Sequence, residues 1–188
     1  RVLPGVPNFF YQSKYIFMKE HIRTILDFPI KGIKYRDITT LLKDPKLFSE
    51  LIDKMTEPWK DKSVDAVLSI ESRGFILAGA IAYKLNAAFI PLRKPDKLPY
   101  ETYNVSFDLE YGSTEMHIHK DALDGHENLL IIDDLLATGG TAIAAVKLVE
   151  NFKSKNIIGA GFIINLPDLD GDKKLSKLGV DIHSIMDF

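Results

Sequence analysis

The sequence predicts a single α/β domain built on a mainly parallel sheet that helices cover on both faces. Ala66–Ile70 and Leu129–Ile132 are short, largely apolar runs, as expected of strands buried on both faces. Each run leads through a polar turn into a segment rich in Ala or Ile, Phe75–Leu85 and Ala142–Phe152, that is typical of a helix. Strand and helix patterns that alternate in this way favour a parallel sheet.

The remaining elements are expected in this order. Met18–Leu26 carries apolar residues at helical spacing and predicts a short helix, whereas Ile33–Ile38 predicts a brief extended stretch. A longer helix is expected from Thr40 until Pro58 ends it, and Pro95–Tyr103 predicts a long mobile loop. The pattern further predicts strands over Ala88–Leu92, Ile157–Ile164 and Ile182–Ile185, a hairpin of Val105–Leu109 with Glu115–His119, and a short helix near Lys173–Leu178.

Composition excludes several classes of protein. The chain has 188 residues, of which 46% are hydrophobic and 27% charged, and a formal net charge of −2, so neither a general nucleic-acid binder nor a membrane-surface binder is expected. With no cysteine, disulfides and cysteine-based zinc sites are excluded. The longest apolar run, Phe75–Tyr83, is too short to span a bilayer. We expect a cytoplasmic protein in which residues 1–17 are an N-terminal extension and residues 18–188 form one domain.

A site for a phosphate beside a sugar is predicted at residues 128–141. Asp133 and Asp134 follow the predicted strand directly, and Thr138-Gly139-Gly140-Thr141 precedes the predicted helix. The N-terminus of a helix presents unpaired N–H groups to an anion, and glycines let the backbone approach it closely. Carboxylates at a strand end accept hydrogen bonds from vicinal hydroxyls. This spacing of phosphate donors and hydroxyl acceptors suits a ribose 5-phosphate.

Two other predicted strands end in groups that bind anions. Glu71-Ser-Arg-Gly follows one strand, and Arg93-Lys94 follows another. The carboxyl ends of parallel strands meet at one edge of the sheet, where ligands of such sheets bind. That edge therefore combines cations for phosphates with carboxylates for hydroxyls or a divalent metal. A Ser-His-Asp hydrolase is not indicated, because no nucleophile elbow is present.

These stretches resemble the type I phosphoribosyltransferases, and several motifs resemble the adenine phosphoribosyltransferases within that family. The resemblance covers roughly residues 20–188. Its motifs are DFPxxGxxYRDIT at 27–39, ESRGF at 71–75, LRKPxKLP at 92–99, LEYG at 109–112 and DDLLATGGT at 133–141.

The resemblance implies a fold and a reaction. The fold would be the type I phosphoribosyltransferase fold: a central, mainly parallel sheet flanked by helices, with a small hood from about 18–40 and 165–188 and a flexible β-hairpin loop. Adenine would displace pyrophosphate from 5-phosphoribosyl 1-pyrophosphate (PRPP) to give AMP, with Mg²⁺ bound mainly through the pyrophosphate and ribose of PRPP. A homodimer is also implied.

The resemblance assigns roles to residues of this sequence. The residues that would hold the ribose and its 5-phosphate are Asp133, Asp134, Ala137, Thr138, Gly139, Gly140 and Thr141. Those that would hold pyrophosphate are Glu71, Ser72, Arg73, Arg93, Lys94 and Lys97, with a cis peptide bond before Ser72. Adenine would stack on Tyr35 between Lys34 and Arg36. Arg73 and Glu110 would be catalytic, Glu110 exchanging a proton with adenine inside a closing loop, Pro95–Glu110.

Several positions keep a second interpretation. Arg36 and Asp37 can form a local ion pair, and Glu110 can be a strand-surface charge. His117 and His119 share one face of a strand, so they suggest either a metal pair or, as we expect, a solvated face.

The base remains the most open part of the prediction. The stacking position, commonly Phe, is Tyr35. The segment 165–172 has Asn165 and Asp172 where the family usually has Glu and Arg, which puts strict adenine preference in doubt. Two alternatives therefore stand beside an adenine-specific enzyme: a transferase for another purine, and a PRPP-sensing regulatory protein without catalysis. Glu71, Arg73 and Glu110 speak against the sensor, because a sensor need not retain groups for the leaving group.

Overall fold

The computed structural model describes residues 18–108 and 113–188. Backbone contacts divide the chain into two compact units, the first ending at Leu51 and the second running from Ile52 to Phe188. None of the helices in the described stretches has the length and apolar character that a membrane crossing needs.

In the first unit, two short strands form an antiparallel hairpin. β1 (Arg23–Leu26) pairs with β2 (Lys34–Asp37), so that Arg23 lies opposite Asp37 and Leu26 opposite Lys34. The predicted extended stretch at 33–38 is therefore confirmed, but the predicted helix over 18–26 is wrong: only residues 18–20 are helical. Leu26 is 66% exposed, so its helical spacing does not mark a buried helix face.

The helix predicted from residue 40 to 58 is divided in two. α2 (Thr39–Leu42) ends before Asp44, and α3 (Pro45–Thr56) begins after it. The Asp44 carboxylate accepts hydrogen bonds from the amides of Lys46 and Leu47 at 2.9 and 3.0 Å. A carboxylate that caps the first turn, followed by proline at the first helical position, starts a new helix here.

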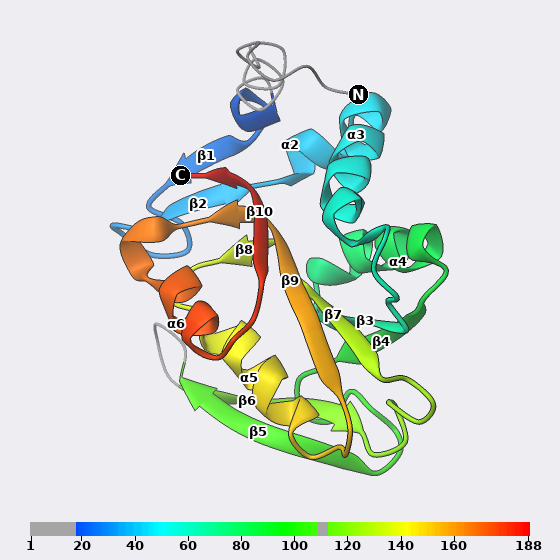
Figure 1. Cartoon of the computed structure of the whole chain (residues 1–188). Helices are drawn as coiled ribbons and strands as arrows, with labels where there is room; N and C mark the ends of the chain where they lie inside the picture. Colours follow the sequence, from blue (N-terminus) through cyan, green and yellow to red (C-terminus); the bar gives the residue numbers. More distant parts are fainter. Residues whose placement is uncertain (1–17, 109–112) are drawn as a thin grey trace. The chain divides into compact units, whose positions relative to one another are not determined.

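The second unit is built on a wholly parallel sheet (Figure 1). Its strand order is β10-β9-β7-β3-β4, and the short β8 pairs with β9. The strands are β3 (Ala66–Ile70), β4 (Ala88–Leu92), β7 (Asn128–Ile132), β8 (Leu135–Leu136), β9 (Asn156–Asn165) and β10 (Ile182–Asp187). The predicted strands of this sheet are confirmed, and the structure adds β8, which was not predicted.

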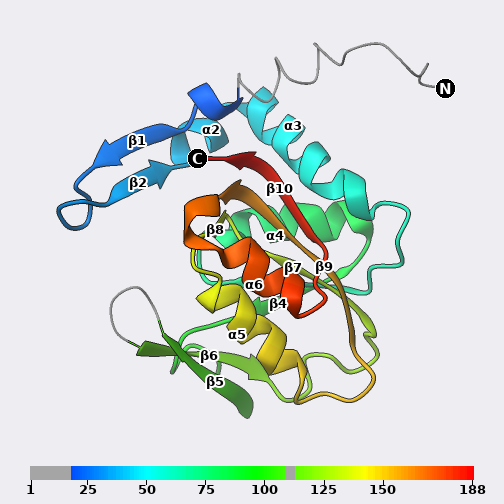
Figure 2. The same cartoon turned by 60° about the vertical axis from the view of Figure 1, so that its left-hand side comes forward.

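Helices cover both faces of this sheet. The helices are α4 (Gly74–Leu85), α5 (Gly140–Val149) and α6 (Gly171–Lys177), with 3-10 turns η1 (Glu57–Trp59) and η2 (Pro167–Leu169). The chain passes from β3 through α4 to one side, and from β7 through α5 to the other. Because such crossovers are right-handed, α4 lies on one face, and α5 and α6 on the other (Figures 1 and 2).

A second hairpin covers α5. β5 (Thr102–Asp108) and β6 (Ser113–His119) pair in an antiparallel register, and Met116 and Ile118 of β6 join α5 and the sheet in one apolar core. The residues between these strands, 109–112, lie outside the described part of the chain. The two backbone hydrogen bonds between Arg93 and His117, 3.0 and 2.8 Å long, tie β6 to the end of β4.

The strand order reverses between β3 and β7, since their crossovers leave in opposite directions. In open parallel sheets the crevice beyond the carboxyl ends at such a point is the usual place of a ligand. The fold therefore predicts a ligand site at the residues that follow Ile70 and Ile132.

Candidate active site

A cavity of about 480 Å³ opens at the carboxyl ends of β3, β4 and β7. It brings together residues predicted from three separate stretches. The predicted residues that line it are Glu71, Ser72, Arg73, Arg93, Lys94, Asp133, Asp134, Ala137, Thr138, Gly139 and Thr141. Gly140 and Lys97 are not among its lining residues; Gly140 begins α5, and the Lys97 carbonyl accepts a hydrogen bond from Arg93 Nη1 at 3.3 Å.

The two adjacent carboxylates occupy different environments. Asp134 is 4% exposed, and its Oδ2 lies 2.7 Å from Nε of Arg73. Asp133 lies beside it, and its Oδ1 accepts the Asp134 amide at 2.9 Å. Burial raises the pKa of Asp133 well above its ordinary value, and the neighbouring Asp134 charge raises it further. Asp133 therefore takes up a proton more readily than an ordinary aspartate does.

Beside them lies the arginine rim, which we define as residues 71–73, 93 and 94. Glu71 Oε2 accepts hydrogen bonds from Arg93 Nε at 3.1 Å and from the Lys94 amide at 3.0 Å. Partial burial favours the neutral acid, but these hydrogen bonds outweigh it and lower the pKa of Glu71. The peptide bond between Glu71 and Ser72 is cis, in agreement with the resemblance. An ionised Glu71 thus orients Arg93 at the edge of the cavity.

The glycine turn, residues 137–141, forms the other wall. Gly139 has φ +83° and is the N-cap of α5, so the chain enters the helix through a left-handed residue that glycine adopts without strain. The Ile143 amide donates to the Gly139 carbonyl at 2.8 Å, which closes the first turn of the helix. The amides that precede Ile143 are the ones a helix leaves without helical partners, and they suit an anion.

The residues predicted to contact a base lie in the first unit, on β2. Tyr35 meets the ring of Phe28 edge-on at 5.1 Å between centroids, on a hairpin whose turn holds the cis Phe28–Pro29 bond. The Arg36 guanidinium donates to Thr24 Oγ1, and the ion pair that the structure gives Asp37 is with Arg23.

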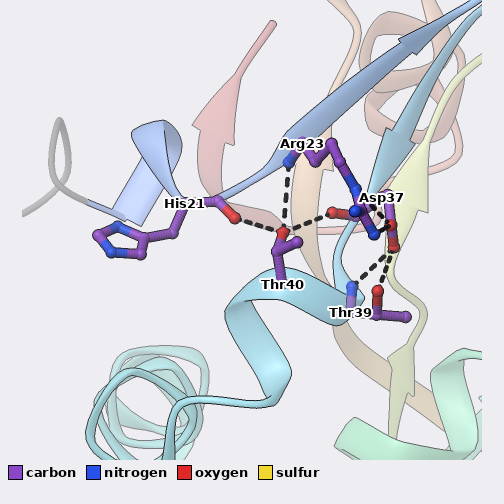
Figure 3. A network of polar contacts seen from close by, with 5 residues as sticks. All are labelled: His21, Arg23, Asp37, Thr39 and Thr40. Atoms are coloured by element: carbon purple, nitrogen blue, oxygen red, sulfur yellow. Dashed lines mark hydrogen bonds and ion pairs between the residues drawn. The ribbon is translucent and has the colours of Figure 1, made fainter.

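Asp37 instead joins β1, β2 and α2 (Figure 3). Its Oδ2 accepts from Arg23 Nε at 3.1 Å, and its Oδ1 accepts from the amide and hydroxyl of Thr39 at 2.9 and 2.6 Å. Thr40 Oγ1 donates to the His21 carbonyl in the same network. The hydrogen bonds from Thr39, and then those from Arg23, lower the pKa of Asp37 to about 2. Asp37 is thus a structural carboxylate.

Sequence reasoning missed part of the cavity wall. The second hairpin and β9 contribute Phe107, Thr114, Glu115, Met116 and Phe162. The alternating pattern of residues 102–119 could have indicated which face of the hairpin points inward, but not that it faces this cavity. The face with His117 and His119 is half-buried rather than solvated: His117 Nδ1 and Nε2 contact Thr102 and Glu115 at 3.1 and 3.0 Å.

This combination of fold and site has known counterparts. The phosphoribosyl transferase domain model matches residues 37–183. The adenine phosphoribosyltransferase of Rhizobium leguminosarum bv. trifolii is 46% identical over 167 residues, which cover 89% of this chain and 92% of that protein. The chain belongs to the adenine phosphoribosyltransferase family.

Solved members of the adenine phosphoribosyltransferase family share the fold. The structure from Rhodothermus marinus has a TM-score of 0.88 at 41% identity and covers 94% of this chain and 99% of its own. The Giardia lamblia enzyme, complexed with 9-deazaadenine, has a TM-score of 0.86 at 33% identity and covers 93% and 97%. The predicted family and the type I phosphoribosyltransferase fold are therefore confirmed.

In this member of the adenine phosphoribosyltransferase family, the atypical segment 165–172 contacts the glycine turn. Asn165 is 6% exposed, and its Nδ2 donates to Asp187 Oδ1 at 3.1 Å. Gly171 lies directly against the backbone of Ala137 and Gly139. The family resemblance implies that this segment lies beside the purine, and in the structure its Gly171 lies beside the phosphate-binding candidate.

Proposed function

We propose that this protein transfers the 5-phosphoribosyl group of PRPP to adenine, giving AMP and pyrophosphate in purine salvage. The observation that carries the proposal is the cavity itself. One cavity is lined by a glycine turn at a helix N-terminus, a pair of aspartates and two arginines. These groups match, in order, a 5-phosphate, ribose hydroxyls and a pyrophosphate. Enzymes named for adenine, among relatives 45–48% identical, support adenine as the acceptor.

The chemistry explains the division of roles. The bond between ribose C1 and the pyrophosphate oxygen breaks, a bond from C1 to the purine nitrogen forms, and that nitrogen loses its proton. Negative charge develops on the leaving pyrophosphate, so preorganised Arg73 and Arg93 stabilise the transition state. Asp133 and Asp134 accept hydrogen bonds from the ribose hydroxyls and keep C1 in position. No covalent nucleophile is required.

Two parts of the proposal rest on the family resemblance. Glu110 is proposed to exchange the proton with adenine, and it lies outside the described residues. Tyr35 is proposed to stack on the purine, while Lys34 and Arg36 offer backbone groups for its edge. The ring of Phe28 beside Tyr35 fits a hairpin that keeps an aromatic face ready for stacking.

Mg²⁺ is proposed to arrive with PRPP. Asp133 and Asp134 offer the oxygen ligands that Mg²⁺ prefers. Among the described residues, no group of three or more acidic or histidine side chains could hold a metal ion. The two aspartates therefore fit a cation that substrate oxygens also hold, and when bound it would neutralise charge on the pyrophosphate.

We extend the proposal to a cytoplasmic homodimer. The absence of cysteine from the sequence fits a reducing compartment. The dimer rests on the family resemblance alone, and sedimentation of the purified protein tests it.

A base panel tests the central proposal. The protein is incubated with PRPP, Mg²⁺ and, in turn, adenine, hypoxanthine and guanine, and AMP, IMP and GMP are separated and quantified. We expect AMP, formed together with pyrophosphate. IMP or GMP in preference to AMP would assign another purine. No nucleotide from any base, with PRPP binding retained, would contradict catalysis and favour the regulatory alternative.

A further inference from the structure

The backbone of Gly171, at the start of α6, touches the glycine turn. A Cβ atom built on Gly171 would lie 2.2 Å from the carbonyl oxygen of Ala137 and 2.8 Å from the amide nitrogen of Gly139. Both atoms are backbone atoms, so a side chain here cannot be accommodated by a rotamer change. Gly171 does not have a positive φ, so this close contact, rather than the backbone conformation, requires glycine.

The contact is reciprocal. A Cβ atom on Gly139 would lie 3.1 Å from Cα of Gly171 and 3.2 Å from its carbonyl oxygen. One helical turn further along α6, the Lys174 ammonium donates a hydrogen bond to the Thr138 carbonyl at 3.1 Å. Three consecutive residues of the glycine turn, Ala137, Thr138 and Gly139, are thus contacted by α6.

α6 itself is anchored firmly enough to act as a support. Leu175 is fully buried in the core that α5 and the sheet share. The Leu175 carbonyl accepts the amides of Leu178 and Val180 at 3.0 and 3.4 Å, which hold the end of the helix. Leu175 therefore anchors α6 in the core, in addition to the contacts of the helix with the turn.

We propose that Gly171 and Lys174 are positioning residues that set the shape of the glycine turn for its phosphate. This inference rests on the proposed function. The donors to the phosphate are backbone amides, whose direction follows the path of the chain. The backbone contact at Gly171 fixes how far the turn can retreat towards α6, and Lys174 fixes the orientation of the Thr138 peptide group. Neither residue is required to touch the substrate.

The test compares two glycine-to-alanine variants. Gly171→Ala places a methyl group against the turn. Gly79→Ala, in α4, is the matched control, because a Cβ atom there meets nothing within 4 Å. Equilibrium dissociation constants are measured by calorimetry for two ligands, ribose 5-phosphate and pyrophosphate. Circular dichroism and thermal unfolding confirm that both variants fold.

We expect Gly171→Ala to weaken ribose 5-phosphate binding at least about tenfold, since displaced amides lose charge-assisted hydrogen bonds. Pyrophosphate binding should stay within about twofold of the wild-type value, and Gly79→Ala should change neither constant. Unchanged ribose 5-phosphate binding in Gly171→Ala would overturn the proposal. So would an equal loss for both ligands, which would indicate general damage to the cavity.

Lys174 offers a milder variant in case Gly171→Ala does not fold. Lys174→Met removes the hydrogen bond to Thr138 and keeps the stem, and we expect a loss of about threefold for ribose 5-phosphate only. Lys174→Arg keeps a donor and should restore most of the affinity. Equal constants for Lys174→Met and wild type would contradict the role of Lys174. Wild-type protein that forms no nucleotide in the base panel would instead refute the proposed function, so the two failures are distinguishable.

Discussion

The two anion-binding walls of the cavity, the arginine rim and the glycine turn, use different chemical groups. In the arginine rim the positive groups are side chains, and Glu71 orients Arg93 through an ion pair 3.1 Å long. In the glycine turn the donors are backbone amides, and packing of Gly139 against Gly171 sets their direction. The rim should therefore respond to changes of charge, and the turn to changes of shape.

Two carboxylates of the site, Glu71 and Asp133, also differ, because their pKa values shift in opposite directions. Hydrogen bonds from the rim lower the pKa of Glu71, whereas burial beside a second carboxylate raises the pKa of Asp133. Glu71 thus remains an ionised structural partner at a pH where Asp133 begins to take up a proton. Substitutions at four positions, taken from the largest expected effect on ligand binding or turnover to the smallest, test this division.

Removal of a rim charge should have the largest effect. For Arg73→Met we expect kcat/KM for AMP formation to fall about 100-fold or more, because a preorganised donor to the leaving group is lost. Initial rates at varied PRPP concentrations measure it. Arg73→Lys keeps the charge without the guanidinium, so its kcat/KM should lie between those of the wild type and Arg73→Met. A loss below about threefold in Arg73→Met would remove Arg73 from catalysis.

A change of shape in the glycine turn should follow. Gly139→Ala introduces a side chain at φ +83° and against Gly171. We expect about tenfold weaker binding of ribose 5-phosphate, since a strained backbone of this kind costs on the order of 1–3 kcal/mol. Calorimetry with pyrophosphate provides the comparison. If both ligands weakened alike, the two walls would not be independent.

Acidification should affect the ribose carboxylates before the rim. Because its pKa is raised, Asp133 becomes neutral at a higher pH than an ordinary aspartate and accepts hydroxyl hydrogen bonds less well. We expect the affinity for ribose 5-phosphate to fall severalfold on acidification, beginning above the ordinary aspartate pKa, and the decline to be flatter in Asp133→Asn. Fluorescence titrations at a series of pH values measure it. The same decline in both proteins would assign it to another group.

A charge outside the cavity should leave ligand binding unchanged. The ionised Asp37 stabilises the fold above the ordinary aspartate pKa, and this stabilisation is lost as pH falls towards its folded pKa of about 2. We expect Asp37→Asn to lower the free energy of unfolding by about 2 kcal/mol at pH 7. The difference from wild type, measured by urea denaturation, should shrink between pH 4 and 3. An altered affinity for pyrophosphate would contradict a purely structural role.

The sequence predicted the sheet and the contents of the cavity well, for physical reasons. Strands of a parallel sheet have apolar sequences, so β3, β4 and β7 could be located from the runs that begin at Ala66, Ala88 and Leu129. Residues that follow such strands meet at one edge whatever the details of packing. The sequence alone therefore predicted that Arg73, Arg93 and Asp134 lie at the same edge of the sheet.

What the sequence could not predict depends on tertiary contacts. Residues 18–26 carry apolar residues at helical spacing, yet pairing with β2 and the Arg23–Asp37 ion pair make residues 23–26 a strand. The support of the glycine turn by α6 joins Ala137 to Gly171, backbone against backbone, and no residue pattern encodes that distance. The role of Glu110 stays a prediction, because it lies outside the described residues.

Simultaneous binding of two ligands tests the central claim most directly. The claim is that one cavity holds a sugar phosphate at the glycine turn and a pyrophosphate at the arginine rim. In calorimetry, protein saturated with ribose 5-phosphate and Mg²⁺ is titrated with pyrophosphate. The account predicts that pyrophosphate still binds, one molecule per chain, without displacing the sugar phosphate. Mutually exclusive binding of the two ligands would contradict it.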